Sequence, residues 1–261
     1  MKSQSIILWE FRPEHYLRDP KCRQQVGRRL ESFRKSFYRR KLWDIRTLYY
    51  WLNSVFRRND LGDREIMEIF RLISACVRMN YNPAFVMEKL NGVLKTGKIK
   101  PEQMPDVTDI GIVSCKKKWK PQSSLFWLGK VLEYEQICIE HIAPLLRLGH
   151  ISGRCGYKQE MIYYFITLLL DHEKIKAVHV KDLIAMVGAA IEGRRDVYSL
   201  IHWLRVFLSL GQTDDRNINR CLRQAALKAQ RGNPHEHFIE SLKLRRRTSL
   251  LEPPIPTPVV A

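Results

Sequence analysis

The sequence has no hydrophobic run long enough to cross a membrane. Its longest apolar stretch, Met161 to Leu170, ends at Asp171, whereas a transmembrane helix needs about 20 apolar residues. We therefore expect neither a membrane span nor a membrane partner. The first residues also lack the apolar segment and small-residue cleavage site of a secretory signal, which argues against secretion.

Cysteine is sparse, and its spacing is uninformative for metals. The six cysteines lie far apart, with no Cys-x-x-Cys pair. This pattern suggests neither a zinc site nor a disulfide framework. We expect buried thiols and a reducing compartment.

Catalytic motifs are also missing. The chain has no G-x-x-x-x-G-K-[ST], no G-x-S-x-G and no H-E-x-x-H, and His235 and His237 are too close in sequence to share one face of a helix. We expect no enzyme activity, no cofactor, no metal site and no small-molecule substrate.

Acidic residues are few relative to basic ones. The chain has 27 Asp and Glu against 45 Lys and Arg, a formal net charge of +18. A domain with this imbalance repels itself unless a polyanion is near, and nucleic acid is the first candidate. At 45% apolar residues the chain can bury a substantial core, so disorder is not expected as its main state.

An internal repeat is visible in the sequence. Segments that begin at Lys41, Met79, Lys117 and Cys155, and are therefore evenly spaced, align without gaps. An aromatic recurs in them at Trp43, Tyr81, Trp119 and Tyr157, and apolar residues follow at helical spacing. A fifth, slightly displaced copy is set on Tyr198.

A second set of amphipathic segments lies between these copies. They cover residues 63–79, 102–117, 134–150, 181–192 and 214–230, and no strand-like alternation appears anywhere. Turn residues, such as those from Gly153 to Gly156, are expected to break the chain between helices. The pattern predicts an all-α fold, an α-solenoid of about five helical hairpins with a 38-residue period.

The predicted organisation has four parts. Residues 1–39 form a basic N-terminal segment and capping helix, and residues 40–232 form the repeat array. A basic C-terminal helix over 233–247 and a proline-rich extended tail over 248–261 follow. The Arg-rich start is similar to an organellar presequence but also contains acidic residues, so a targeting signal within residues 1–40 stays open.

A basic residue precedes each repeat aromatic by three residues, and further basic residues surround it. A row of Lys and Arg side chains at one edge of the array can follow a phosphate backbone, and Trp119 can stack on a nucleobase. Alternatively, a base in the last turn of a helix simply complements the helix dipole. The predicted RNA-binding residues are Arg40, Arg78, Lys116, Lys117, Lys118, Trp119, Lys120, Arg154, Arg194 and Arg195.

The repeat resembles a known class. A helical hairpin of this length that is entered through an aromatic-x-Pro segment, as at Tyr81-Asn82-Pro83 and Trp119-Lys120-Pro121, resembles the octotricopeptide, heptatricopeptide and FASTK/RAP-related repeats. The likeness lies in repeat length and layout; a PPPEW-like signature and a C-terminal RAP domain are absent. Those families are organellar and bind RNA.

The resemblance implies a location in the mitochondrial matrix, with another reducing compartment as the alternative. The first hypothesis is a structural subunit of the mitochondrial ribosome that contacts rRNA phosphates and neighbouring proteins of the particle. A free organellar RNA stability or processing factor is the second. A protein-binding α-solenoid scaffold is the third.

Overall fold

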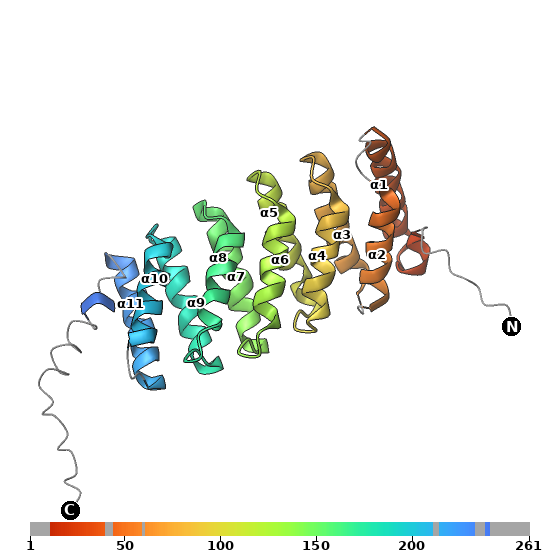
Figure 1. The fold of residues 1–261 in the computed structure, drawn as a ribbon. Helices are drawn as coiled ribbons and strands as arrows, with labels where there is room; N and C mark the ends of the chain where they lie inside the picture. Colours follow the sequence, from red (N-terminus) through yellow and green to blue (C-terminus); the bar gives the residue numbers. More distant parts are fainter. Residues whose placement is uncertain (1–10, 40–43, 59–60, 211–213, 233–237, 241–261) are drawn as a thin grey trace, which may run out of the picture. The chain divides into compact units, whose positions relative to one another are not determined.

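The computed structural model describes residues 11–39, 44–58, 61–210, 214–232 and 238–240. These residues are predominantly α-helical and contain no β-strand (Figure 1), which confirms the predicted all-α class. The helices are α1 (Pro20–Arg39), α2 (Ile45–Arg58), α3 (Asp63–Arg78), α4 (Pro83–Lys95), α5 (Met104–Lys116), α6 (Pro121–Glu133), α7 (Ile139–Cys155), α8 (Gln159–Leu170), α9 (Ala177–Glu192), α10 (Val197–Leu210) and α11 (Asp215–Arg231), with short 3-10 turns at Pro13–His15 and Pro101–Gln103.

Helix starts recur at a fixed interval along the chain. The even-numbered helices α2 to α10 begin at positions 45, 83, 121, 159 and 197, which are evenly spaced at the period of the sequence repeat. The intervening helices begin at 63, 101, 139, 177 and 215, when α5 is counted from its leading 3-10 turn. The same interval separates the left-handed residues Asn80, Lys118, Gly156 and Arg194.

The chain divides into two compact units, residues 1–171 and 172–261. In the first unit the helices form two rows, because α1, α3, α5 and α7 pack on one another in order, and α2, α4, α6 and α8 do likewise (Figure 1). Four apolar side chains at one repeat position, Leu52, Leu90, Leu128 and Ile166, are fully buried in the second row. Repeated burial of this kind supplies the main stabilisation of such a layer.

The second unit contains α9, α10 and α11. Helix α9 packs closely on α11. The buried ring of Phe207 on α10 contacts that of Phe238, with centroids 5.6 Å apart. Phe238 belongs to the basic helix predicted over 233–247; the rest of that segment outside 238–240, and the predicted tail 248–261, lie outside the described residues.

The first turns of α3, α7 and α9, and the 3-10 turn that leads into α5, are closed in the same way. The side chains of Glu65, Gln103, His141 and His179 each accept a hydrogen bond of 3.0 Å from the backbone N–H three residues earlier. This is half of a capping box, which satisfies an N–H group that the helix itself leaves unpaired. Two histidines thus stand where glutamate or glutamine is usual.

One predicted helix was misplaced. Residues 134–150 were expected to be helical with a break at Gly153, but α7 runs over Ile139–Cys155. Both internal glycines are packing positions: a Cβ on Gly149 would overlap the Tyr163 hydroxyl, and one on Gly153 would lie 2.6 Å from a Val113 methyl. Close helix approach, rather than chain termination, explains these glycines.

Candidate nucleic-acid interface

Three identical turns connect the two rows of the first unit. After α3, α5 and α7 the chain passes through a left-handed residue, and the next N–H reaches back five residues: Tyr81 to Cys76 at 2.9 Å, Trp119 to Ser114 at 2.8 Å and Tyr157 to Ser152 at 2.9 Å. This is the Schellman arrangement of a helix C-terminus. The repeat aromatics Tyr81, Trp119 and Tyr157 are therefore equivalent and half-buried, while Trp43 lies outside the described residues.

These turns carry a cluster of cations that we call the basic edge. All its members are exposed, none forms an ion pair with a described residue, and the turns at 78–82, 116–120 and 154–158 contain no acidic residue. The basic edge consists of Arg78, Lys116, Lys117, Lys118, Lys120, Arg154 and Lys158. Sequence reasoning missed Lys158, although it stands one full repeat after Lys120.

The helix dipole explains only part of the basic edge. Arg78, Lys116 and Arg154 lie in the last turns of their helices, where a positive charge is favoured. Lys120 and Lys158 are the N-cap residues of α6 and α8, where the dipole disfavours a cation. The helix dipole therefore does not explain lysine at these two positions.

Lys118 occupies an unfavourable backbone conformation. Its φ is +59°, in the region that suits glycine or asparagine, and Asn80 and Gly156 are the residues found there in the adjacent turns. A lysine at this place costs about 1 kcal/mol relative to glycine. Arg194 shares this conformation at φ +54° in the second unit, and strain of this kind is typical of functional positions.

The turn in the second unit differs from the other three. Arg194 takes the left-handed position, and Arg195 takes the place of the repeat aromatic, because its N–H donates to Ala190 at 2.8 Å. The expected displacement of the fifth copy is wrong, since the start of α10 follows that of α8 by the same interval as in the earlier copies. Glu192 occupies the repeat position that Arg78, Lys116 and Arg154 occupy in the earlier turns. The Nε of Arg195 donates a hydrogen bond of 3.2 Å to the Ala229 carbonyl.

The predicted sites thus fall into three groups. The structure brings Arg78, Lys116 to Lys120 and Arg154 to equivalent turns of one unit. Arg194 is exposed in the other unit, and Arg195 leaves the row. Arg40 lies outside the described residues.

A second recurring feature was not anticipated: pairs of adjacent aromatic residues on the even-numbered helices. Tyr50–Trp51, Phe126–Trp127 and Tyr164–Phe165 begin five residues after the starts of α2, α6 and α8. The Trp127 and Tyr164 rings join two of these pairs across α6 and α8, with centroids 4.9 Å apart. The signal was present in the sequence as an aromatic dipeptide at one position of the repeat, with Glu88-Lys89 in its place on α4.

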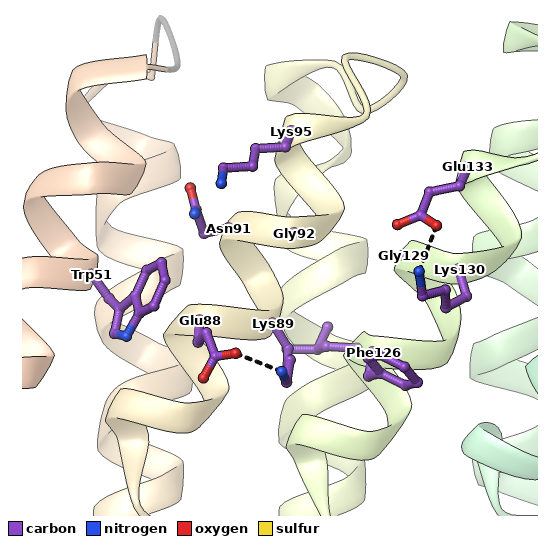
Figure 2. Close-up of a pocket in the computed structure, with 11 residues that line it drawn as sticks. Trp51, Glu88, Lys89, Asn91, Gly92, Lys95, Phe126, Gly129, Lys130 and Glu133 are labelled. Atoms are coloured by element: carbon purple, nitrogen blue, oxygen red, sulfur yellow. Dashed lines mark hydrogen bonds and ion pairs between the residues drawn. The ribbon is translucent and has the colours of Figure 1, made fainter.

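A hollow of about 240 Å³ opens between α2, α4 and α6 on this face (Figure 2). Its rim includes Trp51 from α2, Lys89, Asn91 and Lys95 from α4, and Phe126 from α6. The Lys89 ammonium lies 5.6 Å from the centre of the Phe126 ring, and that of Lys130 lies 5.9 Å away. Both lysines are also paired with glutamates, Lys89 with Glu88 at 2.6 Å and Lys130 with Glu133 at 2.7 Å.

Other chemistry is weakly represented in the described part of the chain. Cys138, Glu140 and His141 have potential ligand atoms within 4.8 Å of one another, a grouping that the sequence analysis did not expect. The Nδ1 of His141 is already used as the acceptor for the Cys138 N–H. Within the described ranges, no helix combines the length and the apolar composition that a membrane span requires.

The cysteines are all free, as expected, but they are not uniformly buried. Cys76, Cys115 and Cys221 are buried, and the other three are half-buried. Cys76 and Cys115, on α3 and α5, lie with their sulfurs 3.7 Å apart. Hydrogen bonding to the second thiol raises the pKa of Cys76 and lowers that of Cys115.

No protein-family profile, curated protein or solved structure matches this chain.

Proposed function

We propose that this chain is an α-solenoid of five helical hairpins that binds RNA along the basic edge. One observation carries the proposal: seven exposed cations occupy three equivalent turns without an ion pair to a described residue and without an acidic residue in those turns. Cations placed in a row at regular intervals match a phosphate backbone. Lys120 and Lys158 oppose the helix dipole, which supports a ligand at this edge.

A protein-binding scaffold is the competing function. Its support is the aromatic face of the even-numbered helices, where lysines are balanced by Glu88 and Glu133. The seven cations of the basic edge lie instead at the turns, away from those ion pairs. A ligand that is itself a polyanion accounts for this separation better than a neutral peptide does.

The proposal extends to a structural subunit of the mitochondrial ribosome in contact with rRNA. Its support is the resemblance of the repeat to organellar RNA-binding repeats, together with the net charge of +18. A short array offers few positions for reading a sequence, so contacts with phosphates and RNA shape dominate. A free RNA stability or processing factor is the alternative, and it would use the same edge.

Two measurements test these statements. The affinity of the purified chain for single-stranded RNA should fall steeply with salt, and a flat dependence would reject contact with phosphates. Sedimentation of the native protein from mitochondrial extracts separates the two RNA roles. A ribosomal subunit migrates with rRNA, whereas a free factor migrates with smaller transcripts or alone.

A further inference from the structure

The hollow on the aromatic face contains a buried amide without a partner. Asn91 is only 2% exposed, and its Oδ1 accepts no hydrogen bond from any described residue. A carbonyl held away from water in this way is destabilising unless something donates to it. Because Asn91 lines the hollow, a molecule that enters there is well placed to supply the donor.

The first repeat shows what satisfies the same position. Asn53 is the equivalent residue one repeat before Asn91 and is equally buried, at 3% exposure. Its Oδ1 accepts a hydrogen bond of 2.8 Å from the Tyr16 hydroxyl. An aromatic hydroxyl therefore donates to the asparagine of the first repeat, whereas no described residue donates to the Asn91 Oδ1 in the second.

The surroundings of Asn91 define the chemistry of its missing partner. Figure 2 shows Asn91 and Lys95 pointing from α4 toward α2, and Trp51 pointing from α2 toward α4. Trp51 offers a flat apolar surface, and Lys95 is exposed and forms no ion pair with a described residue. The two lysines near Phe126 are neutralised by Glu88 and Glu133.

We infer that this hollow binds an unpaired nucleobase of the RNA, an inference that rests on the proposed function. The base stacks on Trp51, an N–H of the base donates to the Asn91 Oδ1, and Lys95 contacts the adjacent phosphate. A nucleotide carries all three groups, a flat ring, a polar hydrogen and an anion, whereas an apolar peptide side chain leaves Asn91 unsatisfied. The stacking is tolerant of base identity, since every base has a π face.

The geometry relative to the basic edge is compatible with one strand. Asn91 and Lys95 lie eight and twelve residues after the start of α4, the helix that follows the turn at 78–82. At 1.5 Å per residue they are about 12 and 18 Å along the helix from that turn. An RNA strand that leaves the turn along α4 can therefore place a base in the hollow and the adjacent phosphate at Lys95.

The test compares two variants of the full chain in binding to a short labelled single-stranded RNA, followed by fluorescence anisotropy. Trp51→Leu should weaken binding roughly tenfold, with an unchanged salt slope because no cation is lost. Asn91→Leu should also weaken binding, while its midpoint of unfolding in urea stays the same or rises, because an unsatisfied buried carbonyl is removed. A purely structural asparagine would lower the midpoint and leave affinity unaltered.

Phe85→Leu is the matched control, because Phe85 is 54% exposed on α4 and does not line the hollow. It should leave RNA affinity unchanged. If Phe85→Leu lowers the affinity as much as Trp51→Leu does, the effect comes from loss of any exposed aromatic residue, and the inference is overturned. Unaltered affinity in both hollow variants also overturns it. If in that case Lys116→Gln still weakens binding, the proposed function stands; if the chain binds no RNA at all, both fall.

Discussion

The Nδ1 atom of His141 accepts a hydrogen bond of 3.0 Å from the backbone N–H of Cys138 and so closes the first turn of α7. Only the neutral imidazole can do this, since the protonated ring carries a hydrogen on both nitrogens. His179 makes the same bond to Lys176 at the start of α9. Both rings are buried, at 4% and 0% exposure.

The stability of the chain should therefore fall in mild acid. Burial lowers the pKa of His141 and of His179 below the ordinary 6.5 in the folded state. The unfolded chain binds more protons than the folded chain as pH drops below 6.5, so the free energy of unfolding is highest above that pH and declines beneath it. Urea unfolding at a series of pH values measures this decline.

The double variant His141→Gln, His179→Gln is the control for that series. Glutamine keeps the capping acceptor and does not titrate, as Gln103 shows at the equivalent position of the 3-10 turn before α5. The decline between neutral pH and pH 5 should be smaller in the double variant. An identical decline would assign the acid sensitivity to other groups.

A buried polar network offers a second prediction, on stability alone. The Ser114 hydroxyl lies 2.8 Å from that of Ser124 and 2.6 Å from the Oε1 of Gln159, whose Nε2 donates to the Gly149 carbonyl at 3.0 Å. Gln159→Leu leaves these groups unpaired and should cost about 1–3 kcal/mol in the free energy of unfolding. Gln122→Leu, at a half-buried position of α6 outside the network, should change it by less than about 0.5 kcal/mol.

Much of the helical layout could be predicted from the sequence because apolar burial repeats. Leu52, Leu90 and Leu128 recur at one position of the repeat and are all buried. A position that is buried in every repeat stays apolar and can be recognised from the sequence alone. Gly153 of α7 misled because a glycine required by a neighbouring side chain looks like a helix end. Val113, whose methyl group requires Gly153, is on another helix.

The site was harder to predict than the fold. The basic residues of the turns were visible in the sequence as a repeated position. Whether such a side chain is available to a ligand depends on tertiary contacts, as the Arg195 bond to the Ala229 carbonyl shows. Asn53 and Asn91 occupy the same repeat position, yet only Asn53 has a donor, from Tyr16 in a segment that precedes the array. No local pattern contains that difference.

Lys118 should trade stability against RNA affinity. Lys118→Gly relieves the left-handed conformation at φ +59° and should raise the free energy of unfolding by about 0.5–1 kcal/mol. It also removes one cation of the basic edge, so affinity for RNA should fall. Lys117→Gly removes the same charge at φ −84°, where glycine only adds freedom to the unfolded chain, and should lower stability. Equal stability changes in the two variants would contradict the strain at Lys118.

The last prediction separates contact with phosphates from a diffuse electrostatic field. In the edge variant, Lys116, Lys117 and Lys118 are each replaced by Gln, and RNA affinity is titrated over a range of salt concentrations. Each lost contact with single-stranded RNA should flatten the plot of log affinity against log salt by roughly 0.7. The fold should survive, because all three side chains are exposed and lie at the end of α5 or just beyond it. If these lysines only complemented the helix dipole, stability would fall by at most ~1 kcal/mol per site and the slope would not move.

The matched control replaces Arg64, Arg147 and Lys181 by Gln, which removes the same charge from exposed residues that are not members of the basic edge. Under the proposal its salt slope stays close to that of the unaltered chain. A control that weakens binding as much as the edge variant would mean that RNA responds to net charge rather than to the turns. If neither triple variant alters affinity, RNA does not bind this surface, and the protein-binding scaffold becomes the better account of the aromatic face.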